Sequence, residues 1–520
     1  MPRRILDRLD DWKRRFEPGG DGELAALLGQ IAARRFKDPA DLIRLHETLL
    51  FLRAYPRTPA VARLADEILA SFATRIASLK DDLTAFEEAE VSGIAGTSFA
   101  AVFSYEVARR LAALHPRRIE IAWDSHDQVD KLGHALARFL PLIEEDWPVE
   151  AHVPFRQWMA AAHDRGITDL AWLLERLADL EPRAAAEAYE ALDLPLLWNI
   201  GNARASRSRL RLPVRKLFCH REPLLRRSDI SLVKELDAPP LPIRRLRRAE
   251  AHRILDVILD TSAMRYRELY GFSHPDESAV FHADAGRGVD VYFFGVPPAW
   301  RLPLRAYHAG MFFKNGVPAG YVELLSLFER AEVGFNLYYT FREGESAWLY
   351  ARLLRLFRQV LGVTCFSVDP YQIGLENSEA IDSGAFWFYR KLGFRPVEPA
   401  VAALVAREER RMAETPGYRS SRRTLEKLAA SYILFEGPGA EPGAWDAFRV
   451  RNLGLAAVRQ SGSGLAQVVS LIPDLPRWPS EDKAALANIL AAKRGPSEVR
   501  YLRLMQRHPR LRAAFLALSH

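Results

Sequence analysis

The sequence predicts an α+β multidomain protein in which helical segments flank a central mixed α/β region. Apolar residues recur at three- and four-residue spacing near both ends of the chain, whereas short β-rich runs alternate with helical segments in the middle. At 520 residues the chain is too long for one simple core, so about three domains are expected. The predicted parts are a helical domain, a connector rich in proline and arginine, a mixed domain and a helical C-terminal region, at 1–185, 186–248, 249–410 and 411–520.

The N-terminal part is predicted to be almost wholly helical. Alanine and leucine dominate it, and runs of β-branched residues are few. Its first residues have the pattern of a short amphipathic helix. Further helices are expected at 42–55, 59–79, 98–114, 124–140, 155–162 and 167–180.

The connector is both basic and interrupted by prolines. Prolines at 195, 213, 223, 239, 240 and 242 indicate a segment that lies across the surface. Nine arginine or lysine residues lie between Arg204 and Arg227, and Glu222 is the one acid among them. Such a stretch suits a polyanion such as RNA or an acidic partner, and it is equally typical of a solvated basic surface.

The central region alternates strands with helices. The pair Asn315-Gly316, set between two apolar runs, predicts a β-hairpin. Strands are expected at 289–294, 304–313, 318–327, 334–340 and 363–368, and helices at 249–259, 345–360 and 378–392. In the C-terminal region the same spacing predicts helices at 421–434, 464–472, 480–492 and 499–507.

One segment of the central region has a specific pattern, Ser383-Gly-Ala-Phe-Trp-Phe-Tyr-Arg-Lys-Leu-Gly-Phe-Arg-Pro396. Gly393 suits a left-handed residue that ends the helix, and Phe394 can begin a strand. The segment resembles the last helix-to-strand unit of the GCN5-related N-acetyltransferase (GNAT) superfamily. The order of elements over about 250–410 is also the one expected of that superfamily's core.

This resemblance implies an acyl-CoA donor and a role for one tyrosine. Tyr389 matches the tyrosine that lies near the thioester sulfur, and as a general acid it would protonate the leaving thiolate. The alternative is a tyrosine that only packs inside an aromatic-rich helix.

The superfamily's phosphate-binding loop has a partial counterpart before the helix expected at 345–360. In the family the loop reads Arg/Gln-x-x-Gly-x-Gly/Ala, and backbone amides at the helix start hold the pyrophosphate of the cofactor. Arg342, Gly344 and Ala347 match this pattern in part, and Ser346 offers a further amide. Two acids, Glu343 and Glu345, put negative charge at the same place, so an ordinary capped helix start is the alternative.

The polar loop after the buried strand and the strand at 318–327 supply the remaining candidates. Asp382 stands where the family motif has an asparagine, and Asn377 lies just before it as a substitute cofactor ligand. A general base must take the proton of an attacking amine, and Glu323 is the first candidate. Ordinary alternation in a half-exposed strand explains Glu323 equally well. The competing bases are Glu332 and His308.

The expected function is therefore an acyl-CoA-dependent N-acyltransferase that acts on an amine of a small molecule or a protein. One alternative is a binding or regulatory protein that keeps a GNAT-like fold without catalysis. Another is an acyltransferase that takes its acyl group from an acyl carrier protein or an aminoacyl-tRNA, for which the basic stretch from Arg204 to Arg227 would be suited.

Composition excludes several other classes of protein. No apolar run reaches the roughly 18–20 residues that span a bilayer, so no membrane contact is expected. Cys219 and Cys365 are the only cysteines, and two distant cysteines make no disulfide framework, which predicts a reducing cytoplasm. One cluster of acids and histidines fits a helix start better than a metal site, so no metal is expected. It consists of Asp124, His126, Asp127, Asp130 and His134.

Overall fold

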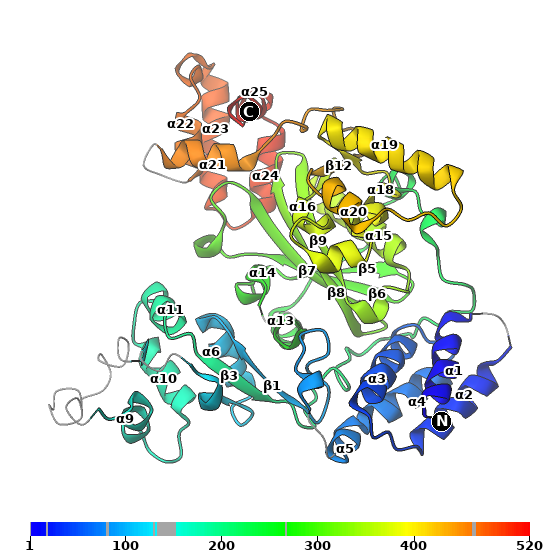
Figure 1. Ribbon diagram of the computed structural model, residues 1–520. Coiled ribbons are helices and arrows are strands. Elements are labelled where there is room, and N and C mark those ends of the chain that lie inside the picture. Colours follow the sequence, from blue (N-terminus) through cyan, green and yellow to red (C-terminus); the bar gives the residue numbers. More distant parts are fainter. Residues whose placement is uncertain are drawn as a thin grey trace. The chain divides into compact units, whose positions relative to one another are not determined.

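The computed structural model describes residues 2–16, 19–79, 83–127, 131–132, 152–265, 268–459 and 464–519. It is a mixed α/β structure with one large mixed sheet and one small sheet (Figure 1). The chain divides into two compact units, each assembled from segments that are far apart in the sequence. Unit 1 is Met1–Pro223, Arg248–His274 and Lys314–Pro318, and unit 2 is Leu224–Arg247, Pro275–Phe313 and Ala319–His520.

Unit 1 begins with helices, as predicted. The helix α3 (Pro39–Ala54) starts where the Asp38 carboxylate accepts the Ala40 amide, with proline at its first position. The helix α4 (Pro59–Ala70) starts in the same way after Thr58. These two helices pack with the other helices near the N-terminus (Figure 1). Those helices are α1 (Pro2–Arg14), α2 (Asp21–Ala32) and α5 (Phe72–Ala77).

The second part of unit 1 contains a three-stranded antiparallel sheet, so the expectation of an almost wholly helical N-terminal part is wrong. The strands lie in the order β1 (Ser98–Val102), β3 (Pro195–Asn199) and β2 (Ile119–Ile121). The helix expected over 98–114 begins only at Tyr105, because residues 98–102 pair with β3. The middle strand β3 lies in the segment predicted as a surface connector, yet its Trp198 side chain is fully buried.

The core of this part of unit 1 lies against that sheet. Buried side chains of the strands and of five helices form one hydrophobic cluster, which includes Phe99, Leu173 and Met264. The helices are α6 (Tyr105–Leu114), α9 (Phe155–Ala161), α10 (Asp169–Ala178), α11 (Pro182–Glu190) and α13 (Arg248–Arg265). The other described elements are η1 (Thr84–Phe86), η2 (Trp123–Ser125) and α14 (Tyr270–Ser273).

Unit 2 is built on a nine-stranded sheet in the order β11-β12-β10-β9-β8-β7-β6-β5-β4. The predicted strands and the Asn315-Gly316 hairpin are confirmed, since β7 ends at Lys314 and β8 begins at Val317. The strand expected at 334–340 lies earlier, because a short helical turn at Tyr339–Phe341 follows its end at Leu337. The strands are β4 (Ile243–Arg245), β5 (Phe281–Gly286), β6 (Val289–Gly295), β7 (Ala306–Lys314), β8 (Val317–Leu327), β9 (Arg330–Leu337), β10 (Cys365–Val368), β11 (Arg395–Pro396) and β12 (Ile433–Glu436).

Helices follow the strands of this sheet. The helix α15 (Ser346–Leu361) comes after β9 and ends at Gly362, which has a left-handed φ of 72°. The helix expected at 378–392 is two helices, because Gly384 interrupts it at a φ of 67°. After β10 come α16 (Pro370–Ile373), α17 (Ser378–Asp382) and α18 (Ala385–Arg390).

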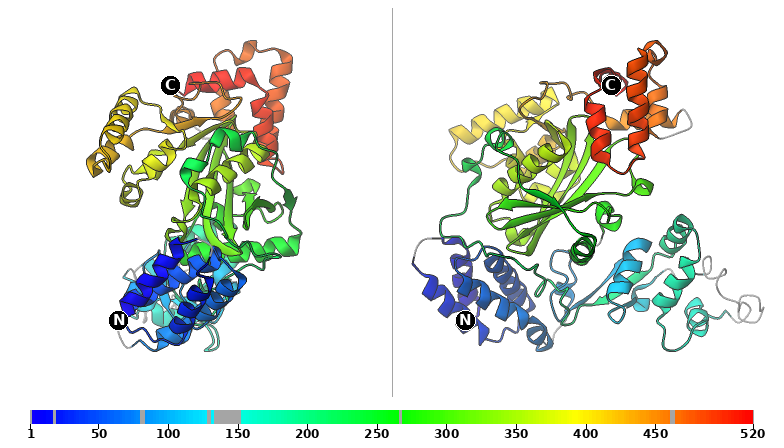
Figure 2. Two further views of the ribbon diagram at one scale, coloured as in Figure 1. Left: turned by 90° about the vertical axis from the view of Figure 1, so that its right-hand side faces the viewer. Right: turned by 180° about the vertical axis from the view of Figure 1, so that it is seen from behind.

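The C-terminal region also contributes to the sheet. The helix expected at 421–434 ends at Leu428, and Ile433 begins β12, which pairs antiparallel with β10. Figure 2 shows α19 (Pro399–Glu414) and α20 (Arg422–Leu428), in yellow, on one side of unit 2 and the last helices on another. Those last elements are α21 (Val450–Val458), α22 (Leu465–Ser470), η8 (Leu475–Arg477), α23 (Ser480–Lys493), α24 (Glu498–Gln506) and α25 (Pro509–Leu518).

The remaining short elements of unit 2 lie before β4 or in loops that follow its strands. They are η5 (Arg227–Asp229), α12 (Leu232–Leu236), η6 (Pro298–Trp300) and η7 (Tyr339–Phe341). Among the helices that the structure describes, none combines the length and the apolar character needed to cross a lipid bilayer.

Candidate functional site

The parallel strands β9 and β10 are paired only over their first residues. The ladder joins Cys365 to Arg330, Phe366 to Ala331 and Ser367 to Glu332. The strand β9 continues to Leu337, and over that length its partner is β8 on the other side. The ladder between β9 and β10 therefore ends at the point where each strand runs on toward a helix, and such ends of parallel strands are where α/β proteins form sites.

The loop between β9 and α15 leaves backbone amides available at the helix start. The amides of Ser346 and Ala347 have no acceptor among the described residues, and the Leu349 amide is the first to bond back, to the Glu345 carbonyl at 2.9 Å. The Gly344 amide instead donates to the Phe341 carbonyl at 2.8 Å. Of the predicted phosphate donors, Gly344 is therefore engaged within its own turn.

The charged residues of this loop are paired in different directions. Glu345 is 1% exposed, and its carboxylate accepts from Nε of Arg287 at 3.0 Å and from the Leu225 amide at 3.2 Å. The negative charge that the sequence places at the helix start is thus compensated by an arginine. Arg342 donates to the Leu337 carbonyl and to the Glu379 carboxylate of α17. Arg342 therefore links the loop after β9 to a helix that follows β10.

Asn377 has a capping role in this structure. Its side-chain carbonyl accepts from the Ala380 amide at 3.1 Å, which caps α17, and its side-chain amide donates to the Tyr371 carbonyl at 3.1 Å. Both of its hydrogen-bonding groups are engaged within the loop after β10.

Tyr389 lies in an aromatic cluster formed by α15 and α18. Its ring is 5.4 Å from that of Tyr350 and 5.6 Å from that of Phe394. Burial raises the pKa of the Tyr389 hydroxyl, which therefore keeps its proton at neutral pH. The Tyr350 hydroxyl is buried without a hydrogen-bond partner among the described residues. The neutral Tyr389 phenol carries a proton that it can donate, and burial makes it a weaker acid than a tyrosine in water.

Glu323 lies on β8, and its carboxylate accepts a hydrogen bond from the Tyr307 hydroxyl of β7. Burial raises the pKa of Glu323, and the hydrogen bond from Tyr307 acts against that rise. Gly334 lies opposite Glu323 on β9, and a Cβ added there would lie 3.8 Å from Nε2 of Gln372. The glycine thus leaves room between the carboxylate and α16.

The two competitors for the role of base are less suitable. Glu332 forms an ion pair with Arg305 at 3.3 Å, so its charge is compensated. His308 is buried, and burial together with the positive charges of Lys493 and Arg301 lowers its pKa to about 4.

Glu323 and Tyr389 are on opposite faces of the sheet. Val322 pairs with Phe335 and Glu323 pairs with Gly334, and successive side chains of a strand alternate between faces. The Phe335 ring contacts Tyr350 at 5.1 Å, on the face that carries the aromatic cluster of Tyr389. The structure therefore does not bring these two predicted catalytic groups together on one face.

The basic stretch is partly used inside unit 1. Arg207 is buried and donates to both oxygens of the Glu47 carboxylate, at 2.8 and 2.9 Å. Arg211 forms an ion pair with Asp66 at 2.5 Å. At least two of the cations predicted to meet a polyanion therefore hold the fold instead.

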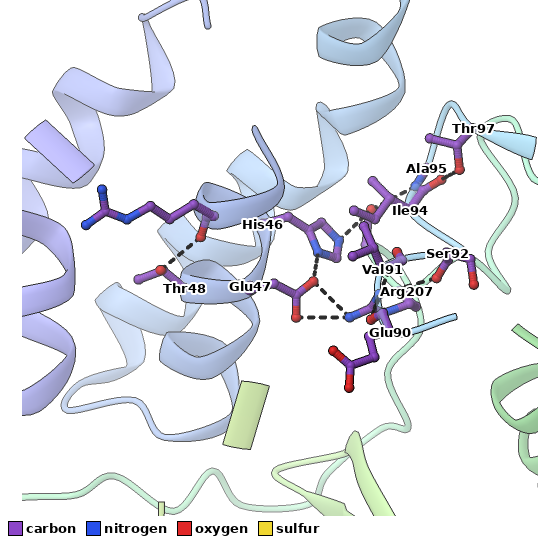
Figure 3. A network of polar contacts seen from close by, with 12 residues as sticks. His46, Glu47, Thr48, Glu90, Val91, Ser92, Ile94, Ala95, Thr97 and Arg207 are labelled. Atoms are coloured by element: carbon purple, nitrogen blue, oxygen red, sulfur yellow. Dashed lines mark hydrogen bonds and ion pairs between the residues drawn. The ribbon is translucent and has the colours of Figure 1, made fainter. Parts of the chain in front are cut away.

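A buried polar network around Arg207 has no counterpart among the sequence predictions (Figure 3). Nδ1 of His46 lies 2.9 Å from the Glu47 carboxylate, and its Nε2 lies 3.0 Å from Oγ of Ser208. A carboxylate only accepts, so the neutral imidazole donates from Nδ1 and accepts the Ser208 hydroxyl at Nε2. Ser208 is 162 positions from His46 in the sequence, and no local spacing joins them.

Serine, histidine and glutamate are hydrogen-bonded in the same order as in a hydrolase triad. Here, however, the three side chains are buried and hold segments of the fold together. Ser208 is 1% exposed, and its Oγ accepts from the Ala95 amide at 3.0 Å. Arg207 also donates to the carbonyls of Glu90 and Val91, at 2.8 and 2.6 Å. The network therefore ties α3 to two distant segments of unit 1, and its serine is closed to a substrate.

The buried His46 should make unit 1 less stable in mild acid. Burial lowers its pKa from 6.5 to about 4, so between those values the unfolded chain binds a proton that the folded chain does not. As the pH falls from 6.5 to 4, we expect a loss of about 3 kcal/mol of folding free energy from this residue. In urea titrations at a series of pH values, the free energy of unfolding of His46→Asn should fall less between pH 6.5 and 4 than that of the original chain. Equal falls in the two proteins would contradict a lowered pKa of His46.

The cluster of acids and histidines at 124–134 lies only partly within the described residues. Asp130 and His134 lie outside the described residues, and the described residues contain no group of three or more acidic, histidine or cysteine side chains that could hold a metal ion.

Comparison of the chain with protein-family models, with curated proteins and with solved structures gives no match.

Proposed function

We propose that unit 2 transfers an acyl group from acyl-CoA to an amine. The observation that carries the proposal is the short β9–β10 ladder, together with the amides of Ser346 and Ala347 that have no acceptor among the described residues at the start of the helix after β9. Antiparallel strands followed by helix, strand, helix and strand are also the order expected from the GNAT resemblance.

The residues at the start of α15 fit the pyrophosphate of CoA. Two amides without an acceptor point out of the first turn of a 16-residue helix, where the helix dipole favours an anion. Arg342 is 37% exposed at its side chain and can exchange its partner Glu379 for a phosphate. Glu345 does not oppose the anion because Arg287 compensates its charge.

Acyl transfer would use one group from each face of the sheet. The acceptor nitrogen attacks the thioester carbonyl, the C–N bond forms and the C–S bond breaks. Glu323 takes the proton that leaves the nitrogen, and the Tyr389 hydroxyl gives a proton to the departing thiolate. The products are an amide and a free thiol. Since the two groups lie on opposite faces, donor and acceptor would meet where the β9–β10 ladder has ended.

Calorimetry with CoA and acetyl-CoA tests the binding half of the proposal. We expect measurable heat and a weaker affinity for Arg342→Gln, because that change removes a charged donor to the phosphates. If CoA, acetyl-CoA and longer acyl-CoAs all give no heat, the protein does not bind CoA and the proposed CoA-dependent reaction is wrong.

Replacing Tyr389 by phenylalanine tests the chemical half. Release of free thiol with a panel of amines should slow by roughly ten- to a thousandfold, within the range of general-acid effects, while CoA affinity stays the same. Tyr418→Phe is the matched control, because Tyr418 lies outside the site and bonds to Glu408. Equal rates for the original chain and Tyr389→Phe would remove the tyrosine from the mechanism.

A further inference from the structure

A cavity of unit 2 is lined by residues that do not belong to the candidate site. It has a volume of about 530 Å³ and is formed by the segment after η6, by α22 and by the end of α23. Most of its lining is apolar, including Leu302, Pro303, Leu465 and Leu490. A cavity of this size with such walls accommodates a small organic molecule.

The charged groups in the cavity wall are all cationic. They are Arg301, Lys493 and Arg494, and none of the described residues that line the cavity is acidic. Lys493 has a carboxylate partner, since its Nζ lies 2.5 Å from Oε1 of Glu498. The positive charges of Arg301 and Arg494 have no such carboxylate partner among the described residues.

Neither Arg301 nor Arg494 bonds to a carboxylate among the described residues. The Nη1 atom of Arg301 donates to the carbonyls of Lys493 and Gly495, at 2.8 and 2.6 Å, which carry no net charge. For the Arg494 guanidinium, no hydrogen bond or ion pair occurs among the described residues, and the residue is exposed. The wall therefore carries two positive charges without a carboxylate counterpart.

Neighbouring ionisable groups respond to this positive potential. Burial lowers the pKa of His308, and Lys493 and Arg301 lower it further. Burial also lowers the pKa of Lys493, and Arg301 adds to that effect against the opposing influence of Glu498. A cationic wall next to apolar side chains favours a ligand that is anionic at one end and apolar at the other.

We propose that this cavity binds a small amphipathic anion, namely a fatty-acid carboxylate, with the carboxylate at Arg494 and Arg301 and the alkyl chain along the apolar wall. Guanidinium groups pair with carboxylates through charge-assisted hydrogen bonds, and the chain gains from burial against Leu465 and Leu490. The inference is independent of the proposed acyl transfer, because none of the lining residues belongs to that site.

Calorimetry on the full chain with dodecanoate, below its micelle concentration, tests the proposal. We expect dodecanoate to bind, acetate to give no heat, and dodecyltrimethylammonium, which has the same chain and the opposite charge, to bind at least about tenfold more weakly. Saturating CoA should leave dodecanoate binding unchanged, which separates this site from the proposed acyl-CoA site.

Two variants locate the bound molecule. Arg494→Gln should weaken dodecanoate binding by roughly ten- to a hundredfold, while Arg500→Gln, a change at an exposed arginine outside the cavity, should leave it unchanged. Ala466→Trp should also weaken binding by filling the cavity without altering the melting temperature. Equal affinity for the anionic and cationic detergents, or unchanged binding to Arg494→Gln, would overturn the proposal. Binding of inorganic phosphate as tight as that of dodecanoate would also overturn it, since the apolar wall would then contribute nothing.

Discussion

Replacing Arg207 by methionine is expected to lower the free energy of unfolding of unit 1 by about 3–5 kcal/mol. The guanidinium makes both short contacts to the Glu47 carboxylate, and both side chains are at least nine-tenths buried. Methionine removes the cation that bonds both oxygens of that buried carboxylate, and the carbonyls of Glu90 and Val91 lose their donor as well. Breaking a buried pair from one side is much more costly than removing both partners.

Two further variants distinguish this explanation from a general loss of packing. In the double variant Glu47→Met with Arg207→Met, both charges are absent, so the loss should be clearly smaller than for Arg207→Met alone. Arg209→Met is the matched control, because the exposed Arg209 guanidinium bonds to Asn202 and to no other described residue, and its effect should stay within about 0.5 kcal/mol. Urea unfolding, read with hydrogen exchange of α3 amides, provides the measurement. Equal losses in Arg207→Met and the double variant would contradict the buried-pair account.

The parts of the fold that local pattern determines were predictable from the sequence. The Asn315-Gly316 pair and the alternating runs around it predict the β7–β8 hairpin, and the structure has it. The strand at Ser98–Val102 was missed, because its alanines favour a helix and its β-structure depends on pairing with β3, about a hundred positions later. The same reason applies to β12, which becomes a strand by pairing with β10.

In the candidate site as well, local sequence pattern predicts a helix, whereas contacts between distant residues are visible only in the structure. The sequence pattern around Tyr389 predicts a buried aromatic helix, and α18 is one. By contrast, the acid at the start of α15 suggested repulsion of a phosphate, and only the structure shows that Arg287, 58 positions away, compensates it. The opposite faces of Glu323 and Tyr389 depend on strand register, which a single sequence specifies poorly.

Replacing Glu323 by glutamine is expected to slow the proposed acyl transfer by roughly 10²- to 10⁴-fold, the range for loss of a general base, with CoA affinity unchanged. Glutamine keeps the size of the side chain and an oxygen that can accept from Tyr307, but it takes up no proton at neutral pH. Glu409→Gln is the matched control, because Glu409 forms only a surface ion pair with Arg390. If Glu332→Gln stops the reaction and Glu323→Gln does not, the base is Glu332.

The pH dependence of turnover separates a base from a structural carboxylate. Since burial raises the pKa of Glu323, turnover should rise with pH through a limb above the usual range of a glutamate. The Tyr307 hydroxyl stabilises the charged carboxylate and so lowers that pKa. In Tyr307→Phe the pKa of Glu323 should therefore rise further, and the limb should move to higher pH while the maximal rate above it changes little. A limb that keeps its position in Tyr307→Phe would show that a group other than Glu323 accepts the proton.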